Sequence, residues 1–406
     1  MHILFLTDNF PPEGNAPATR TFEHCRRWVT QGHKVTVITG APNFPEGKVF
    51  DGYKNSWYSK SVMDGIEVRR VKTYITANEG FAKRILDYLS FMMTSFFAGL
   101  FVSKPDVVVA TSPQFFTACA GWLLSVFRRK PYVFELRDIW PASITAVGAM
   151  EKSKAIVALE KLEMFLYRRA DLIVSVTNTF KEELVKRGVD GSKIVVVLNG
   201  VNLTQYSPRP KSQELLAQHE LGDRFVAAYV GTHGLAHALE ALVDAAQQLQ
   251  HRDDIVFLFA GGGAGAEQVK KLVDEKQLGN VKVLGRQPKE LMPAIWSLCD
   301  VSIVHLKDAE LFRSVIPSKI FESMGMGLPL IIGVPEGEAT AIVKKHQAGL
   351  VVPPEDVSAI AQAIERMADD RELRQQLAQQ SHGAAKHFER DNLADSMLAE
   401  LEKLAV

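Results

Sequence analysis

The stretch Pro317-Ser-Lys-Ile-Phe-Glu-Ser-Met-Gly-Met-Gly-Leu-Pro-Leu-Ile-Ile332 predicts a helix followed by a short buried strand. Pro317 suits the first position of the helix, where its missing N–H is not needed. The amides of Ser318 and Lys319 would then lie in the first turn, and unpaired amides at a helix N-terminus attract anions. Lys319 adds a positive charge to this turn. Glu322 follows Lys319 by one helical turn, so the same face carries a carboxylate.

This arrangement favours a nucleotide-sugar site. Four residues of helix rise by about 6 Å, which is the reach from a diphosphate to its ribose. Ser318 and Lys319 would bind the phosphates, and the Glu322 carboxylate would accept both ribose hydroxyls. The alternative is that Lys319 and Glu322 form an exposed ion pair, which is a common and weak arrangement on helices.

Apolar, β-branched runs alternate with helical stretches along the whole chain, which predicts parallel sheets built from βαβ units. The predicted strands of the first half are Ile3–Thr7, Lys34–Thr39, Glu67–Thr73, Asp106–Thr111, Tyr132–Leu136, Leu172–Thr177 and Ile194–Leu198. Those of the second half are Phe225–Val230, Ile255–Ala260, Val281–Leu284, Val301–Val304, Leu330–Ile332 and Leu350–Val352. The fold class is therefore α/β, with two Rossmann-like, doubly wound domains facing a cleft.

Asn199-Gly-Val-Asn202, followed by Ser207-Pro-Arg-Pro210, is the best candidate linker, because glycine and proline interrupt both periodicities. We expect an N-terminal domain at residues 1–205 and a C-terminal domain at residues 206–385. A last helix, at about residues 386–406, is expected to return to the first domain.

The charge balance changes sign at the same place. Residues 1–205 hold 26 Lys and Arg against 19 Asp and Glu, whereas residues 206–406 hold 21 against 28. A basic first half suits an anionic surface or a phosphate-bearing partner. The three cysteines are far apart and show neither metal-ligand nor disulfide spacing, which fits a reducing cytoplasm. Residues 1–8 are expected to form a first strand rather than a signal peptide.

Residues 85–102 form the one strongly apolar helix, flanked by Lys83-Arg84 and Lys104. Three alternatives remain open from the sequence: a buried crossover helix, a helix partly exposed to the membrane interface, and a transmembrane span. The polar residues within it and the strand that follows make the span the weakest of the three.

Glycine-rich turns follow two strands of the second half. Gly231-Thr-His-Gly234 would point its amides at the crevice above the sheet, with His233 and His237 beside it as donors or as structural residues. Gly261-Gly-Gly-Ala-Gly265 partly matches a dinucleotide pattern. An NADP-dependent oxidoreductase therefore stays an alternative, with Arg286 binding the 2′-phosphate, although Arg286 could equally bind a diphosphate.

Two loops of the first half carry further candidates. The loop Asp8–Arg20, which contains Gly14, follows the first strand at the edge where doubly wound folds bind ligands. Arg137 and Asp138 follow another strand, and charges at that position are costly unless they are paired or face a cleft. They are candidates for catalysis, or they simply pair with each other.

Together these motifs resemble the family 4 glycosyltransferases with the GT-B fold, in particular the WbuB-like enzymes of O-antigen and exopolysaccharide assembly. The resemblance covers nearly the whole chain and rests on Phe10-Pro-Pro-Glu-Gly14, Gly32-His-Lys-Val-Thr-Val-Ile-Thr39, Arg137-Asp-Ile-Trp-Pro141, Asn199-Gly-Val201, Gly231-Thr-His-Gly234, and Pro317-Ser-Lys-Ile-Phe-Glu322 with Gly327-Leu-Pro329.

The resemblance implies a retaining transferase that moves a sugar, an N-acetylated amino sugar in our expectation, from a UDP-sugar to a lipid-diphosphate-linked saccharide. The second domain would bind the donor through Gly231, His233, Gly234, Arg286, Ser314, Ser318, Lys319 and Glu322, with Gly14 contributing from the first. The first domain would bind the acceptor, and Asp138 could help to deprotonate its hydroxyl. No metal, cofactor or nucleic acid is expected. The enzyme would lie at the cytoplasmic face of the membrane as a peripheral protein.

One departure from the family pattern concerns its pair of glutamates, which are seven residues apart. The second falls on Glu322, but the first falls on Ser314. Glu310 could substitute for the missing carboxylate, or Ser314 could act as a hydroxyl donor. The basic pair after the first strand of the second domain is also absent, with His233 and His237 in its place. A GT-B protein that binds a nucleotide sugar without transferring it is therefore a further alternative.

Overall fold

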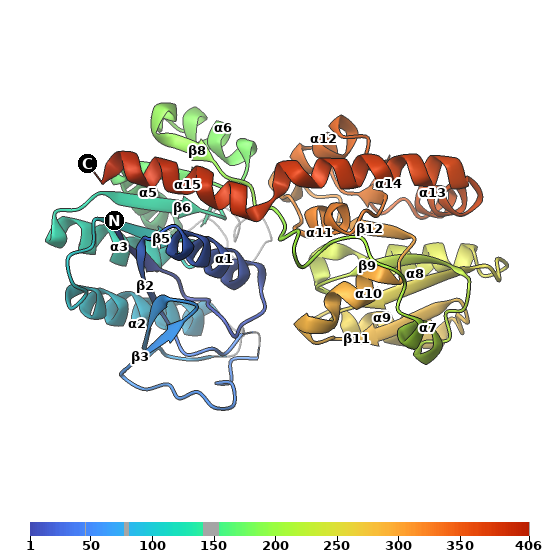
Figure 1. Cartoon of the computed structure of the whole chain (residues 1–406), viewed down its shortest axis with the longest axis horizontal. Helices are drawn as coiled ribbons and strands as arrows, with labels where there is room; N and C mark the ends of the chain where they lie inside the picture. The colour runs from blue at the N-terminus through green and yellow to red at the C-terminus, as the bar shows by residue number, and fades with distance from the viewer. Residues whose placement is uncertain (45, 77–80, 141–153, 406) are drawn as a thin grey trace. The chain divides into compact units, whose positions relative to one another are not determined.

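The computed structural model describes residues 1–44, 46–76, 81–140 and 154–405. The chain divides into two compact units, which are described separately: residues 1–199 with 390–406, and residues 200–389. The division falls after Asn199, within the predicted linker, and the two units contain separate, mainly parallel sheets with helices on both faces (Figure 1). This is the GT-B class predicted from the sequence.

The first unit is built on a sheet in the order β3-β4-β2-β1-β5-β6-β7-β8. Its strands are β1 His2–Leu6, β2 Lys34–Thr39, β3 Tyr58–Met63, β4 Ile66–Val71, β5 Val107–Thr111, β6 Tyr132–Leu136, β7 Leu172–Ser175 and β8 Ile194–Val196. Its helices are α1 Ala16–Thr30, α2 Phe81–Leu100, α3 Phe115–Arg128, α5 Lys154–Arg169, α6 Asn178–Lys186 and α15 Arg390–Leu404, with the short η1 Gly191–Lys193. The central strands are buried along their whole length, as expected for a sheet that is covered on both faces.

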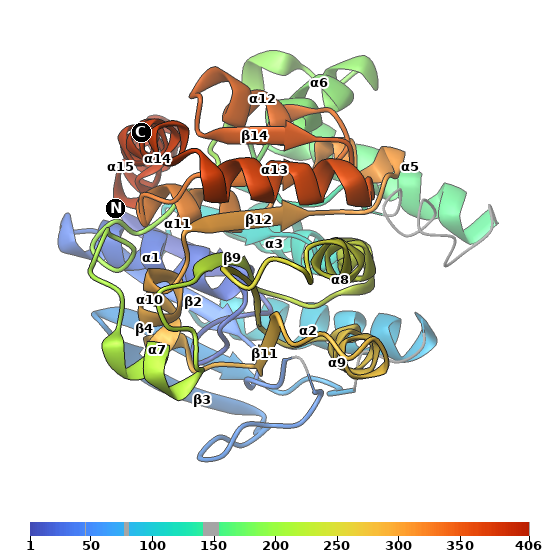
Figure 2. The ribbon, with the colours of Figure 1, turned by 90° about the vertical axis from the view of Figure 1, so that its right-hand side faces the viewer.

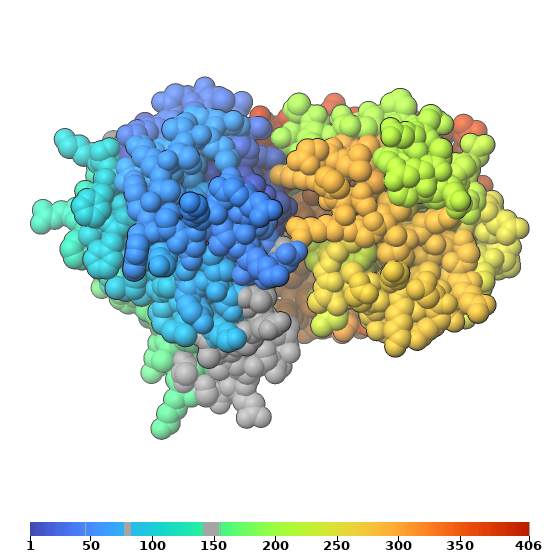
Figure 3. Space-filling model, turned by 90° about the horizontal axis from the view of Figure 1, so that it is seen from below, coloured from blue at the N-terminus to red at the C-terminus, as the bar shows by residue number. Residues whose placement is uncertain are grey.

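β3 is the strand that the sequence prediction missed. It pairs antiparallel with β4 through the two-residue turn Asp64-Gly65, where both residues have positive φ. Its residues are exposed apart from Met63, so no buried alternation marks it. The hairpin lies on the surface shown in Figure 3. The dipeptide Asp-Gly was the available signal, because it is typical of tight hairpins.

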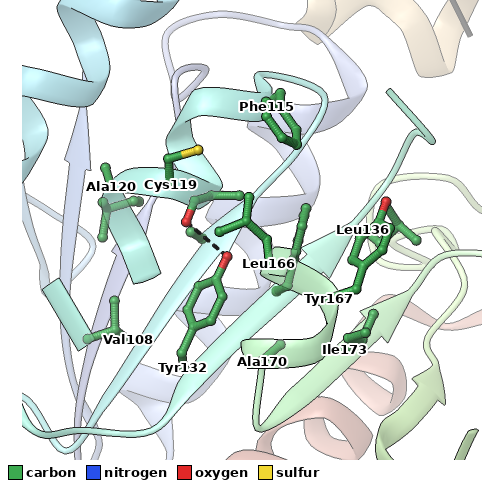
Figure 4. Packing of buried hydrophobic residues seen from close by; sticks show 14 of the residues in the cluster. Val108, Phe115, Cys119, Ala120, Tyr132, Leu136, Leu166, Tyr167, Ala170 and Ile173 are labelled. Carbon is green, nitrogen blue, oxygen red and sulfur yellow. Dashed lines mark hydrogen bonds between the residues drawn. The ribbon is translucent and has the colours of Figure 1, made fainter. Parts of the chain in front are cut away.

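Close packing fixes the helices of the first unit on the sheet. A Cβ on Gly121 of α3 would lie 2.5 Å from the Cβ of Ala110 in β5, so only glycine allows this approach. Nearby, the Tyr132 hydroxyl donates to the carbonyl of Ala118 at 2.9 Å (Figure 4). The core on this face of the sheet thus joins α3 to β5 and β6 without leaving the buried phenol unpaired.

Helix α2 packs one face on this core and exposes the other. Phe91 is fully buried, whereas Leu86, Met93 and Phe97 are 53%, 49% and 52% exposed. The structure therefore shows a packed crossover helix with an exposed apolar face, and contact of that face with a membrane interface stays a prediction. No helix among the described residues is both long enough and apolar enough to cross a membrane.

The second unit is built on a sheet in the order β11-β10-β9-β12-β13-β14. Its strands are β9 Phe225–Val230, β10 Ile255–Ala260, β11 Val281–Gly285, β12 Val301–His305, β13 Leu330–Gly333 and β14 Gly349–Val352. Its helices are α7 Gln213–Gln218, α8 Leu239–Gln248, α9 Ala266–Glu275, α10 Met292–Ser297, α11 Lys319–Gly325, α12 Glu338–Lys345, α13 Val357–Asp369 and α14 Arg371–Ala385, with the short η2 Leu235–His237, η3 Lys289–Leu291, η4 Glu310–Ser314 and η5 Lys386–Phe388. Helices α8, α9 and α13 share the core on one face of the sheet (Figure 2).

Helix α15 completes the first unit, although the second unit separates it in sequence from the rest. Arg27 of α1 makes two hydrogen bonds to the Asp395 carboxylate, at 2.8 and 2.7 Å, and the Trp28 indole donates to the Ala394 carbonyl at 2.9 Å. Met397 and Leu401 belong to the same core as Trp28. The helix begins at Arg390, where the sequence predicted a start at about residue 386.

We predict that Leu401→Ala destabilises the protein by about 2–5 kcal/mol, because the substitution leaves a cavity under α15. Urea unfolding followed by tryptophan fluorescence measures the change. Glu402→Ala is the matched control, since Glu402 is exposed and its contact with His33, at 3.5 Å, is a weak surface pair. Equal losses from both substitutions would show that α15 does not contribute core packing.

Candidate functional site

Two turns at the carboxyl edge of the second sheet pack backbone against backbone. The Gly231 amide donates to the Ala260 carbonyl at 2.8 Å, and the His233 amide donates to the Gly262 carbonyl at 2.9 Å. A Cβ on Gly261 would lie only 1.7 Å from the Gly231 carbonyl oxygen. Gly231 and Gly261 also have φ values of +134° and +153°, which favour glycine. The glycines therefore hold the turns after β9 and β10 in contact.

This packing also accounts for the partial dinucleotide pattern at residues 261–266. A Cβ on Gly263 would lie 2.6 Å from the His233 carbonyl oxygen, and that oxygen accepts the Gly265 amide at 2.7 Å. The glycines are required by the neighbouring turn of the same unit. Their spacing alone is consequently no sign of an NADP site.

His233 is fully buried between the two turns. In the part of the chain that the structure describes, neither of its ring nitrogens has a hydrogen-bond partner. Burial, together with the nearby Lys319 charge, lowers the pKa of His233 to about 4. The imidazole is therefore neutral near pH 7 and keeps one N–H available for an oxygen atom of a ligand.

Lys319 supplies the charge beside this histidine. Its side chain is 7% exposed, and its Nζ has no hydrogen-bond partner among the described residues. The Nζ lies 3.6 Å from the centroid of the Tyr229 ring, and an ideal Cβ on Gly231 would approach it to 3.3 Å. Burial lowers the pKa of Lys319 to about 7, against the opposing effect of the Glu322 carboxylate. Such a cation is costly to bury, and an anionic ligand would stabilise it.

The helix that carries Lys319 begins later than predicted. Helix α11 starts at Lys319, with Ser318 as the preceding cap residue, because the Pro317 carbonyl already accepts the Ile320 amide at 3.1 Å in a tight turn. Pro317 is therefore outside the helix. The Ile320 amide is the first one that donates within this turn, and the amides of Ser318 and Lys319 precede it.

Glu322 is half-buried on the same helix and affects Lys319 electrostatically. The alternative of an exposed Lys319–Glu322 ion pair is wrong, because Lys319 is buried and its Nζ has no partner in the described part of the chain. Arg286 follows Gly285 at the end of β11, and its side-chain carbons lie beside Gly262. Gly231, Gly234, His233, Lys319 and Arg286 therefore lie at the same edge of the second sheet.

Glu310 and Ser314 lie in η4, between β12 and α11. The Glu310 side chain is 82% exposed and pairs with Arg313 at 3.1 Å. The Ser314 hydroxyl donates to the Leu311 carbonyl at 3.1 Å. In this structure neither side chain belongs to the buried cluster around Lys319.

The candidates of the first unit lie in a separate group of charges. The amides of Arg137 and Asp138 donate to the Ser112 hydroxyl at 2.8 and 3.2 Å, which fixes the turn after β6. The Arg137 guanidinium donates to the Pro17 carbonyl at 3.3 Å, and burial lowers its pKa to about 10. Gly14 lies in the β1–α1 loop with open space at its Cβ position. Pro141 of the same motif lies outside the described residues.

Sequence reasoning missed two buried groups. Tyr229, at the end of β9, supports Lys319, and only its position two residues before Gly231 could have indicated this role. His305 of β12 supports the turn after β9: its Nδ1 donates to the His237 carbonyl at 2.7 Å, while its Nε2 accepts the Glu355 amide at 3.0 Å. Among the described residues, no group of three or more histidine, cysteine or carboxylate side chains could hold a metal ion.

Comparisons with known proteins identify the family. Residues 18–205 match the model for Glycosyltransferase Family 4, and residues 211–383 match the model for glycosyl transferases group 1. The chain belongs to the family 4 glycosyltransferases. It is 24% identical over 374 residues to the putative colanic acid biosynthesis glycosyl transferase WcaI of Escherichia coli, covering 90% of this chain and 91% of that protein.

Solved structures show the same fold. The sucrose-phosphate synthase of Thermosynechococcus elongatus aligns over 100% of this chain and 99% of its own, with a TM-score of 0.78 and 18% identity. HepE of Anabaena in complex with UDP-glucose aligns over 100% of both chains, with a TM-score of 0.72 and 16% identity. At these identities the likeness establishes the fold of this glycosyltransferase and nothing finer.

We predict that Lys319→Met stabilises the ligand-free protein, and by more at pH 6 than at pH 9. The pKa of Lys319 is about 7 when folded, against about 10.4 for an unperturbed lysine. Between these values the unfolded state binds more protons, so the penalty of the buried charge shrinks as pH rises. Thermal unfolding at both pH values measures the gain. Lys270→Met, at an exposed lysine of the same unit, should change little at either pH.

Proposed function

We propose that this glycosyltransferase moves a sugar from a UDP-sugar to a lipid-diphosphate-linked saccharide, with retention at the anomeric carbon, in O-antigen or exopolysaccharide synthesis. The donor sugar would be an N-acetylated amino sugar. The observation that carries the proposal is the pair of unsatisfied groups at the carboxyl edge of the second sheet, the Lys319 ammonium and the His233 imidazole. The sugar-nucleotide complexes of HepE and the colanic acid pathway named for WcaI are consistent with it.

The diphosphate of the donor would complete this site. As the bond to the sugar breaks, negative charge grows on the leaving phosphate, and preorganised donors directed at that charge lower the barrier. Lys319 supplies the charge and His233 one N–H donor. The Ser318 amide and the Arg286 side chain would add further donors, whereas the Gly234 amide donates to His237 Nδ1 at 3.2 Å and holds the turn. These protein groups would do this work without a metal ion or another cofactor.

The remaining candidates would position the rest of the substrates. Glu322, on the face of α11 that carries Lys319, would accept the ribose hydroxyls. Ser314 or Glu310 would contact the transferred sugar after a rearrangement of η4. In the first unit, Asp138 would assist deprotonation of the acceptor hydroxyl, with Arg137 and the Gly14 loop nearby.

We predict that Lys319→Ala and Glu322→Gln each weaken UDP binding by about 1.5–3 kcal/mol, because each removes one charged partner of the nucleotide. Isothermal titration calorimetry measures the affinity, and Lys270→Ala serves as the control lysine. In transfer assays, Lys319→Ala should lower kcat more than it raises KM for the donor, because the phosphate charge grows in the transition state. Unchanged UDP affinity in both variants would refute the site.

A second candidate function is donor binding without transfer, and Ser314 is the observation that favours it. A single-turnover assay distinguishes transfer from binding alone. It uses a panel of radiolabelled UDP-sugars, with a membrane extract as the acceptor source. Product formation by the wild-type protein supports transfer. Tight UDP-sugar binding without product or hydrolysis over the whole panel supports a binding protein.

We further propose that the first unit attaches peripherally to the cytoplasmic face of an anionic membrane. Past the end of α2, Phe101 is 81% exposed, and at the end of α3 Val126 and Phe127 are 56% and 67% exposed. They continue the exposed stripe of α2, because Phe127 packs edge-on against Phe96 with ring centroids 5.4 Å apart. The neighbouring basic residues Lys104, Arg129 and Lys130 complement anionic lipid headgroups.

We predict that Phe97→Glu with Phe101→Glu reduces binding to phosphatidylglycerol liposomes at least tenfold, because two charges replace two inserted rings. Phe96 is left in place, since it packs on Phe127. Flotation measures binding, and wild-type binding should weaken in high salt. Val62→Glu, at a 70% exposed residue of β3, is the matched control and should bind as wild type does. If the double variant floats like the wild type, this surface does not contact lipid.

A further inference from the structure

The Tyr229 ring lies against the Lys319 ammonium. The tyrosine side chain is 1% exposed, and its hydroxyl donates to the Thr232 carbonyl at 2.8 Å, which fixes the ring. The face of the ring lies 3.6 Å from Lys319 Nζ. The ring also contacts the imidazoles of His233 and His237, with centroids 5.7 and 6.0 Å away. One aromatic side chain thus touches the three groups at the centre of the site.

A buried ammonium usually needs a carboxylate or several carbonyl oxygens, and here the described residues give Nζ neither. The negative face of an aromatic ring attracts a cation without accepting conventional hydrogen bonds from it. The N–H groups of Lys319 therefore remain available, while the ring still holds the charge in place. A carboxylate in the position of the ring would instead compete with an incoming phosphate.

We propose that Tyr229 is a positioning residue, whose ring keeps Lys319 aligned for the donor diphosphate until the phosphate oxygens take over. The inference rests on the proposed function only in identifying the anion as the diphosphate of a UDP-sugar. Tyr229 makes no contact with substrate in this account; it acts through Lys319. The ring is the part that matters, and the hydroxyl only anchors it.

The proposal has a pH signature. The charged and titratable groups around Lys319 are Glu322 on its own helix, His233 and His237 after β9, and His305 of β12. Burial lowers the pKa of His233 and of His237 to about 4, and it also lowers that of His305. Lys319, with a pKa of about 7, is then the group that takes up a proton when a diphosphate binds near neutral pH. Without the ring its charged form loses support, so its pKa falls further.

The test is a double-mutant cycle on UDP affinity at pH 7.5, measured by calorimetry. Tyr229→Phe keeps the ring and should bind UDP within about twofold of wild type. Tyr229→Leu removes the ring and should weaken binding roughly tenfold to thirtyfold, the worth of a desolvated cation–π contact. In the Lys319→Ala background, Tyr229→Leu should cost less than about twofold, because the ring then has no cation to hold.

A second readout is the pH profile of UDP affinity between pH 6 and 9. Relative to Lys319→Ala, the wild-type advantage should decline above pH 7, and for Tyr229→Leu the decline should begin at lower pH. Circular dichroism checks that Tyr229→Leu folds. If it does not fold, Tyr229→Met replaces it, because methionine also lacks a ring and its side chain is more flexible.

The outcomes distinguish a failure of the role proposed for Tyr229 from a failure of the proposed function. Equal losses from Tyr229→Leu with and without Lys319 would show a structural role and overturn the inference, while leaving the proposed function intact. Wild-type binding of inorganic pyrophosphate without binding of UDP would refute the nucleotide assignment, and the same cycle run with pyrophosphate would then decide the role of Tyr229. Binding of neither compound would overturn both.

Discussion

The backbone contact between the turns after β9 and β10 is the constraint on which the second unit depends. No side chain fits between Gly261 and the Gly231 carbonyl, so the two strands can end side by side only with glycine at this point. The contact buries His233 and directs the turn towards Lys319. The candidate binding groups are thus positioned by main-chain packing, which is more rigid than a set of surface side chains.

The two units differ in the groups that lie beside their buried charges. In the first unit, Arg20 and Glu135 are each 1% exposed and pair at 3.0 Å, and Arg390 pairs with Glu23 at 2.5 Å. Each of these buried charges therefore lies beside an opposite charge, although Glu135 Oε2 has no hydrogen-bond partner among the described residues. In the second unit, the buried Lys319 ammonium rests on an aromatic ring without an acceptor. A buried charge without an acceptor lowers stability, and such local costs are typical of functional sites.

The sequence was sufficient for the architecture because buried parallel strands are continuous apolar runs bounded by glycine, proline and polar residues. Such runs can be recognised without knowing which strands pair with each other. It failed at β3, whose exposed residues carry no such run. For the site, local spacing correctly placed His233 beside a glycine turn and Lys319 on the helix with Glu322. Tyr229 escaped notice because its contact with Lys319 spans ninety residues of sequence, and an aromatic at a strand end is normally only core. The ion pair of Glu310 with Arg313 depends on the path of η4, which sequence does not define.

The return of α15 to the first sheet has a consequence for biosynthesis. The chain crosses between the units at two neighbouring points: Arg390 donates to the Asn199 carbonyl at 3.1 Å, and Val201 donates to the Phe388 carbonyl at 2.8 Å. Residues 200–389 are contiguous and can complete their core as soon as they leave the ribosome. The first unit, although made first, exposes the side of α1 around Trp28 until α15 has been synthesised. During translation the nascent first unit is therefore the part that needs protection from aggregation, for the whole time taken to make the second unit.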